Sequence, residues 1–367
     1  MIMKKTKLCV GDWVEILSKE EILRTLDENG QLEGMPFMPE MFAFCGKRLQ
    51  VYKRAHKTCD TVFPVRGRRV HQAIHLDTRC DGSAHGGCQA SCLLFWKEAW
   101  LKPLGKNPSE VATISQRVSP DRENAAQSCG GCSEMQVWSR AQSVSADSDE
   151  PTYTCQATQL PYATTNLEWW ELSQYIEDYR SGNVGLWRLV CGAVYFPYLW
   201  LSRTGIGLGR PMRWFYDTFH RLWAGTPFPR RRGTIPVGGR TPVKSLNLEP
   251  GELVRIKPYK EILDTIDYHN RNRGLFFDAE EVPYCGQTFR VQRRVNKIVN
   301  ERTGKMRIMK TPSVILDSVI CESRYSECRL ACPRSIYSYW RETWLERVEP
   351  ARTAQPIRDE DQVTAPR

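Results

Sequence analysis

The feature that most constrains this chain of 367 residues is that it contains two related segments. "VGDWVEI" at 10–16 matches "PGELVRI" at 250–256, and "FCGKRLQV" at 44–51 matches "YCGQTFRV" at 284–291. Both segments close on similar tryptophan-rich stretches, "FWKEAWL" and "YWRETWL". Because these matches occur in the same order, the sequence predicts duplication of one structural unit of about 100 residues.

Each unit is expected to combine short strands with an inserted helix. "GDWVEI", "GKRLQVYKRA" and "QAIHL" have the composition and alternation of strands. The stretch that begins at Ser18 predicts a short amphipathic helix, with Ser18 as N-cap, Glu21 as its reciprocal partner and Gly30 as the stop. "SCLLFWKEAWLK" is expected to form a second helix, because Leu93, Trp96 and Trp100 would fall near one face.

This arrangement of "GDWVEI", an excursion and "CGKRLQVYKR" resembles an SH3-like barrel of the kind found in KOW-type and nitrile-hydratase-β-like domains. The whole chain also resembles an uncharacterised bacterial family with paired copies of the unit, which brings no established activity. The expected fold class is therefore α+β, with two small SH3-like β-barrel repeats that carry inserted helices and are joined by a largely helical insertion. The expected boundaries are 8–105 for the first repeat with its cysteine cluster, 106–160 for a loop-rich linker that contains cysteines, 161–245 for a helical insertion rich in aromatic and basic residues, 246–349 for the second repeat and 350–367 for a disordered tail.

Cysteine usage depends on the compartment. The basic N-terminal stretch lacks the apolar core of a secretory signal, and the longest apolar run, 189–201, is too short to span a bilayer and contains Pro197. The sequence therefore favours a cytoplasmic location. In a reducing compartment, the 14 cysteines indicate metal ligands or reactive thiols more readily than a disulfide framework.

The stretch "CDGSAHGGCQASC" places Cys80, Cys88 and Cys92 in one short loop. This spacing fits no common zinc finger, whereas iron–sulfur sites tolerate varied spacing in glycine-rich loops. If only the first repeat binds metal, Cys59 or Cys155 is the expected fourth ligand. If both repeats do, Cys45 and Cys285 are better candidates, and the second site would comprise Cys285, Cys321, Cys328 and Cys332.

These residues predict a cysteine-ligated metalloprotein that binds an iron–sulfur cluster for redox or structural purposes. The first alternative is a zinc-stabilised SH3-like scaffold for nucleic acid or a protein partner, and unligated thiols remain a third reading of the cysteines. Cys129 and Cys132 form a separate C-x-x-C pair, for which loop thiols are expected more than a redox role because no strand precedes it. No catalytic residue is assigned.

Histidines and acids near these motifs are expected to have structural or surface roles. His71 and His75 precede the cysteine loop on one face of an expected strand, and His85 lies within the loop, where it is a further candidate for the fourth ligand. The acid pairs at 20–21 and 280–281 are interpreted as solvated helix starts.

A basic and aromatic surface is the last candidate site. The net charge is +10, and arginines flank several tryptophans and tyrosines in the helical insertion. Such a surface could bind a protein partner, an anionic membrane surface or nucleic acid, and a membrane-surface accessory protein is the second alternative function. The simplest interpretation is that the aromatics pack on the barrels while the arginines stay in water. The arginines are Arg203, Arg210, Arg213, Arg230, Arg231 and Arg232.

Overall fold

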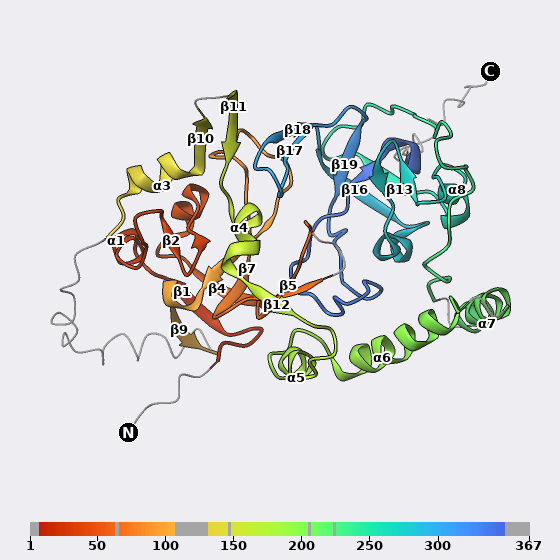
Figure 1. Cartoon of the computed structure of the whole chain (residues 1–367), viewed down its shortest axis with the longest axis horizontal. Helices are drawn as coiled ribbons and strands as arrows, with labels where there is room; N and C mark the ends of the chain where they lie inside the picture. The colour runs from red at the N-terminus through yellow and green to blue at the C-terminus, as the bar shows by residue number, and fades with distance from the viewer. Residues whose placement is uncertain are drawn as a thin grey trace, which may run out of the picture.

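The structure is a computed structural model that describes residues 7–62, 66–106, 131–145, 148–204, 207–222 and 225–348. Helices and small antiparallel sheets occur together, so the predicted mixture of α and β structure is confirmed (Figure 1). Cys129 and the predicted tail at 350–367 lie outside the described residues.

The two related segments each form a five-stranded antiparallel sheet with the same strand order. The first sheet has the order β8-β7-β4-β1-β9 and the second β20-β19-β16-β13-β21. No ladder among the described residues joins the two edge strands of either sheet, so the predicted closed barrels are not formed. The strands of the first sheet are β1 (Trp13–Ile16), β4 (Arg48–Arg54), β7 (Ala73–Arg79), β8 (Leu93–Lys97) and β9 (Leu101–Gly105), and those of the second are β13 (Leu253–Ile256), β16 (Thr288–Arg294), β19 (Ser313–Leu316), β20 (Trp340–Arg341) and β21 (Leu345–Arg347).

The two cores repeat the same aromatic packing. Phe37 meets the edges of Trp96 and Trp100, and Phe277 meets Trp340 and Trp344 in the same way. The indole N–H of Trp100 donates to the hydroxyl of Thr25 at 3.0 Å, and that of Trp344 donates to Thr265 at 2.9 Å. A buried indole N–H needs such a partner, and corresponding threonines supply it in the two halves.

The first predicted helix is present and is shorter than expected. Helix α1 (Lys19–Leu23) begins at Ser18, whose hydroxyl accepts the N–H of Glu21, while the Glu21 carboxylate accepts the N–H of Ser18. This is the predicted reciprocal cap. The helix ends at Leu23, well before Gly30. Its counterpart in the second half is α8 (Tyr259–Leu263).

The second predicted helix is wrong. The residues after Cys92 form strand β8, one 3-10 turn (η2, Glu98–Trp100) and strand β9. All five residues of β8, including Lys97, are buried. A strand covered on both faces has a continuous apolar sequence. Over so short a stretch, periodicity alone cannot distinguish such a strand from a buried helix.

The part of 106–160 that the structure describes includes helices and a β-hairpin. It contains α3 (Glu134–Ala141), the hairpin of β10 (Gln142–Ser145) and β11 (Ser148–Tyr153), and the start of α4 (Gln156–Ala163). Strand β12 (Thr165–Leu167) then pairs with β6 (Gly67–Arg69), which also pairs with β5 (Lys57–Cys59). In Figure 1, α4, β12 and β5 lie toward the middle of the molecule, whereas α3 lies at the outer side of the first half beside α1 and β2.

The helical insertion contains α5 (Ser173–Arg180), α6 (Leu186–Leu201) and α7 (Gly209–Leu222), which follow one another along one edge of the molecule (Figure 1). The longest apolar run lies in α6. No helix in the described ranges has both the length and the apolar character needed to cross a membrane.

Short elements complete each half. The 3-10 helix η1 (Pro39–Phe44) has its counterpart in η4 (Ala279–Tyr284). The remaining hairpins are β2 (Gln31–Leu32) with β3 (Met35–Pro36), β14 (Arg271–Asn272) with β15 (Leu275–Phe276), and β17 (Lys297–Val299) with β18 (Met306–Ile308).

The two halves meet through their cysteine loops. The first cysteine loop, 80–92, contacts β17 of the second half, where the N–H of Val299 donates to the Sγ of Cys88 at 3.3 Å. The second cysteine loop, 321–332, contacts β5 of the first half, where the ammonium group of Lys57 donates to the carbonyl of Leu330 at 2.7 Å. Val299 and Cys59 are the corresponding residues of β17 and β5. Each cysteine loop is therefore covered by a hairpin of the other half, the first loop by β17 and β18 and the second by β5 and β6.

Candidate metal centre

Four cysteine side chains line one small cavity between β8, α4 and the first cysteine loop. They belong to Cys80, Cys88, Cys92 and Cys155. The cavity has a volume of about 30 Å³, more than a single water molecule requires. Of Cys59 and Cys155, the two cysteines expected as fourth ligand, the structure therefore brings Cys155 to the loop. The cavity is also lined by His85, Val299 and Arg334.

The first cysteine loop is closed by backbone contacts that bring its ends together. The N–H of Cys80, just after β7, donates to the carbonyl of Cys92, just before β8, at 2.9 Å. Within the loop, Gly82 has a φ of +77°, and a Cβ atom there would lie 2.1 Å from the carbonyl oxygen of Cys88. Only glycine permits this approach, so the sequence "DGSAHGGC" encodes the tight turn that carries Cys88 back toward Cys80.

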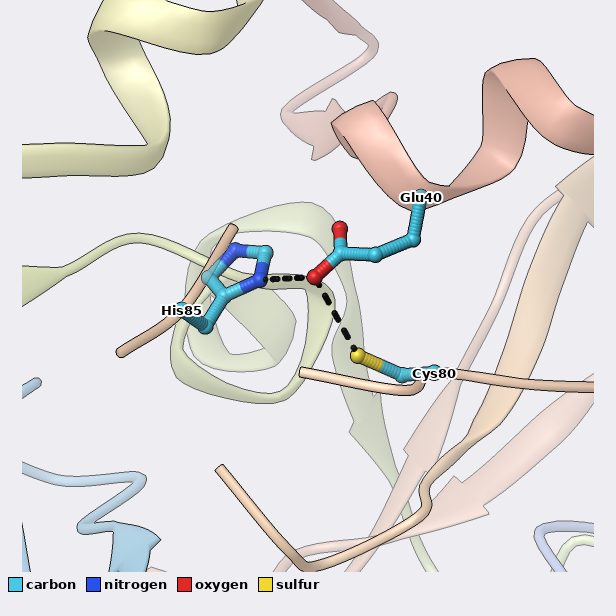
Figure 2. A group of neighbouring side chains, drawn as sticks. All are labelled: Glu40, Cys80 and His85. Atoms are coloured by element: carbon cyan, nitrogen blue, oxygen red, sulfur yellow. Dashed lines mark hydrogen bonds and ion pairs between the residues drawn. The ribbon is translucent and has the colours of Figure 1, made fainter. Parts of the chain in front are cut away.

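A buried carboxylate organises the same loop. The Oε1 atom of Glu40, on η1, accepts from the N–H of Ala84 at 3.1 Å and lies 2.7 Å from Nδ1 of His85. The Sγ of Cys80 is directed to the same oxygen at 3.7 Å. Figure 2 shows the carboxylate between the imidazole and the thiol. Glu40 therefore fixes the position of Cys80 and the fold of its loop at once.

His85 extends this network to the fourth cysteine. Its Nε2 atom lies 3.0 Å from the carbonyl oxygen of Thr154, the residue before Cys155. Cys155 itself is the N-cap of α4, and its N–H donates to the hydroxyl of Thr158 at 3.0 Å. Since both imidazole nitrogens face acceptors, His85 positions the site and has no nitrogen left for a metal ion in this arrangement.

Burial sets the protonation of the thiols. It raises the pKa of Cys80 strongly, that of Cys92 to about 12 and that of Cys155 to about 11. Neighbouring thiols of the cavity raise these pKa values further, because adjacent negative charges repel each other. Without a cation these three thiols are neutral at pH 7. A bound metal ion would displace their protons, as metal binding to cysteine generally does.

The spacing of the ligand atoms distinguishes between kinds of metal site. Within the described part of the chain, Glu40, Cys80 and His85 form the one group of three or more whose ligand atoms all lie within 4.8 Å of one another. No three of the cavity thiols meet that limit. A single tetrahedral zinc ion, with Zn–S bonds of about 2.3 Å, holds its sulfurs roughly 3.8 Å apart. A [4Fe–4S] cluster holds its thiolates farther apart, because each one binds a different iron.

The other candidate ligands lie in three different environments. Cys59 lies against Cys332, and Cys321 is close to both. Cys285 packs in the core of the second half, and so does Cys45 in the first. Cys328 is half-buried in a turn where its charged neighbours are Glu327, Arg329 and Glu168. Hence the structure does not assemble Cys285 and Cys328 with Cys321 and Cys332.

The acid pair at 280–281 is not a solvated helix start. Glu280 and Glu281 are both buried. The Oε2 atom of Glu280 accepts from the N–H of Arg324 at 2.9 Å, and its Oε1 atom accepts from the hydroxyl of Ser326 at 3.0 Å. Glu280 thus organises the second cysteine loop as Glu40 organises the first. The alignment of the two repeats pairs these two glutamates, and this was the signal in the sequence that could have revealed Glu40.

The remaining motifs have structural roles. His75 is fully buried, its Nδ1 atom lies 2.8 Å from the carbonyl of Leu94, and burial lowers its pKa to about 3. His71 is exposed. Cys132 is buried beside α1, where its N–H donates to the carbonyl of Leu23.

Comparison of the chain with family models, with curated proteins and with solved structures gave no match.

Proposed function

We propose that this protein is an iron–sulfur protein whose cluster is held by Cys80, Cys88, Cys92 and Cys155. The observation that carries the proposal is that four thiols from two distant parts of the chain line one cavity. Thiolates are the ligands that iron–sulfur clusters take, and glycine-rich loops supply N–H groups near the sulfurs. The cluster would serve redox chemistry or hold the first half to α4.

Two further features support a cluster over a single zinc ion. The first is that no three of the four thiols lie within 4.8 Å of one another, whereas one tetrahedral zinc ion holds its sulfurs roughly 3.8 Å apart. The second is Arg334, whose guanidinium group lines the cavity and would offset the negative charge of a thiolate-ligated cluster.

The experiment is purification without oxygen, followed by an absorbance spectrum with iron, sulfide and zinc analysis. An iron–sulfur protein is brown and absorbs near ~400 nm through charge transfer from sulfur to iron. A colourless protein with stoichiometric zinc would support the zinc-stabilised scaffold instead. A protein that contains neither metal would leave the four thiols unligated and overturn the proposal.

The relation of the repeats to SH3-like domains is a further part of this proposal. Its support is the shared strand order, in which the first strand lies between the second and the fifth, and the 3-10 turn that precedes the fifth strand in both halves. The open edges of both sheets count against it.

A second candidate function is attachment to an anionic membrane surface, which one observation favours. Helices α5, α6 and α7 all expose large apolar side chains, and none of the residues of α7 is buried. On α6, Trp187, Val190 and Val194 form a stripe on the face opposite the buried Tyr195 and Leu199. Such stripes with neighbouring arginines are typical of helices that lie in a membrane interface.

The arginines divide between this surface and internal ion pairs. Arg203 pairs with Glu327 at 2.5 Å, Arg230 with the same glutamate at 3.8 Å, and Arg231 pairs with Asp217. Arg210, Arg221 and Arg232 are exposed, and Arg213 is half-exposed. Flotation of the protein with phosphatidylserine vesicles tests this function, and a protein that stays with the soluble fraction would contradict it.

A further inference from the structure

A pair of cysteines joins the two halves of the molecule at a place that the candidate metal centre does not use. Cys59 is the last residue of β5 in the first half, and Cys332 ends the second cysteine loop in the second half. Each thiol lies near enough to the other to shift its pKa. Both side chains are buried, with exposed fractions of 8% and 4%. A disulfide requires two neighbouring cysteines of this kind.

An arginine is directed at one of the two sulfurs. The Nη1 atom of Arg334 lies 3.9 Å from the Sγ of Cys59 and 3.4 Å from its carbonyl oxygen. The guanidinium group is fixed by Glu301 at 3.0 Å and by the hydroxyl of Thr61 at 3.2 Å. Because the arginine is anchored from both halves, its positive charge stays beside the sulfur of Cys59.

The two thiols therefore differ in acidity. The thiol of Cys332 and the charges of Arg334 and Arg329 lower the pKa of Cys59, although burial and Glu301 oppose them. The thiol of Cys59, together with burial, raises the pKa of Cys332 well above its usual value. The pair thus combines a more acidic with a less acidic thiol, and disulfide formation needs one thiolate and one thiol.

Cys321 is the third cysteine near this pair. Its thiol lies 3.5 Å from the hydroxyl of Ser323. Because Cys321 has this separate partner, Cys59 and Cys332 are the two thiols that can react with each other.

We propose that Cys59 and Cys332 form a peroxide-sensitive dithiol that closes into a disulfide between the two halves of the protein. The thiolate sulfur of Cys59 attacks one oxygen of hydrogen peroxide, the O–O bond breaks, and the departing oxygen takes up a proton and leaves as water. The sulfenic acid of Cys59 is then attacked by the sulfur of Cys332, which releases a second water. In sum, two thiols and one peroxide give one disulfide and two waters.

Burial selects the oxidant. A glutathione disulfide or a protein disulfide is too large to reach two sulfurs that are more than nine-tenths covered, whereas peroxide is similar in size to water. The second consequence concerns Arg334, which also lines the cavity of the candidate metal centre. Disulfide formation removes the thiolate charge that faces this arginine, so the oxidation state of the pair is coupled to the charge beside the cavity.

The test is peptide mapping of the full-length protein after reduction, removal of the reductant and brief treatment with hydrogen peroxide. Free thiols are alkylated before digestion. The expected product is a peptide pair linked through Cys59 and Cys332 that disappears after renewed reduction. In Cys332→Ser, oxidation is expected to stop at the sulfenic acid of Cys59, which dimedone traps. The exposed Cys191 supplies the matched control, because Cys191→Ser should leave the linked pair unchanged.

Two outcomes would overturn the proposal. One is a Cys59 thiol that stays reduced while Cys191 is oxidised, and the other is a disulfide from Cys59 to Cys321. The result is independent of the proposed cluster, because the wild-type protein gives this readout with or without metal. If Cys59→Ser instead removed iron from the protein, Cys59 would be a cluster ligand and the dithiol would be excluded. Arg334→Gln provides a further check, since it should slow the oxidation several-fold while both cysteines remain.

Discussion

The Nε2 atom of His85 lies 3.0 Å from the carbonyl oxygen of Thr154, a residue 69 positions later in the chain. This hydrogen bond attaches the first cysteine loop to the start of α4 and thereby brings Cys155 to Cys80 and Cys88. The other imidazole nitrogen is held by Glu40 at 2.7 Å. The site is thus supported by a buried network that runs from η1 through the loop to α4.

Replacement of Glu40 should weaken metal retention without removing a metal ligand. Glu40→Gln keeps the shape of the side chain and alters its interactions with His85, Ala84 and Cys80. Loss of such supporting groups typically lowers metal affinity about 10–100-fold. The measurement is iron retained during titration with a chelator. Glu280→Gln is the matched control, since it removes the equivalent carboxylate from the second loop and should leave iron retention unchanged.

The oxidation of Cys59 should depend on pH with a midpoint below that of a free cysteine, because its surroundings lower the pKa of this thiol. The thiolate, which is the reactive form, predominates above that pH and is lost as pH falls below it. The groups that set this pKa are the thiol of Cys332, Arg334, Arg329 and the opposing Glu301. The rate of disulfide formation with peroxide between pH 4.5 and 9 measures it. A midpoint at about 8.5, the value of a free cysteine, would show that neither Cys332 nor Arg334 lowers the pKa of Cys59.

Loss of Asp178 should destabilise the protein strongly. Its carboxylate is fully buried on α5 and pairs with Lys57 at 2.6 Å and with His56 at 3.3 Å. Removing one partner of a buried ion pair costs about 3–5 kcal/mol, because the other charge remains buried and unpaired. Denaturant unfolding of Asp178→Ala measures the change. The exposed pair of Arg347 and Glu252 gives the contrast, and Glu252→Gln is expected to change stability by less than about 1 kcal/mol.

Charges placed on the apolar face of α7 should weaken vesicle binding if this surface meets a membrane. Phe215 and Phe219 are exposed one helical turn apart, and Arg210 and Arg221 are exposed on the other side of the helix. Phe215→Glu combined with Phe219→Glu should reduce flotation with phosphatidylserine vesicles at least several-fold, because insertion of the apolar face and attraction to anionic lipid both weaken. Trp138→Glu is the control, since Trp138 is exposed on the separate helix α3. Equal flotation of both variants would assign the binding to another surface.

Much of the fold was predictable because the repeat doubled the information in the sequence. Residues that recur at corresponding places, such as the tryptophans that pack on Phe37 and Phe277, indicated one unit folded twice. The predicted cap at Ser18 is present because it depends only on local spacing. The helix expected after Cys92 failed, because complete burial of β8 is a tertiary property that local periodicity does not contain.

The candidate site was predictable in part for the same reason. The spacing of the first cysteine loop identified three of the four cavity thiols, and Cys155 stood among the alternatives for the fourth. What the sequence could not show is that each loop is covered by the opposite half. Cys59 therefore lies beside Cys332 and not beside the loop that follows it in the chain. Contacts of this kind depend on how the two units pack against each other. The spacing of residues within one unit carries no information about that packing.

The most direct test of the central claim is the iron and sulfide content of anaerobically purified Cys155→Ser compared with Cys191→Ser. Cys155 lines the cavity and comes from outside the repeat, whereas Cys191 is exposed on α6. We expect Cys191→Ser to be brown and to contain iron and sulfide in equal amounts, and Cys155→Ser to lose most of both. Equal iron and sulfide in the two variants, or their absence from the wild-type protein, would contradict a cluster held by Cys80, Cys88, Cys92 and Cys155.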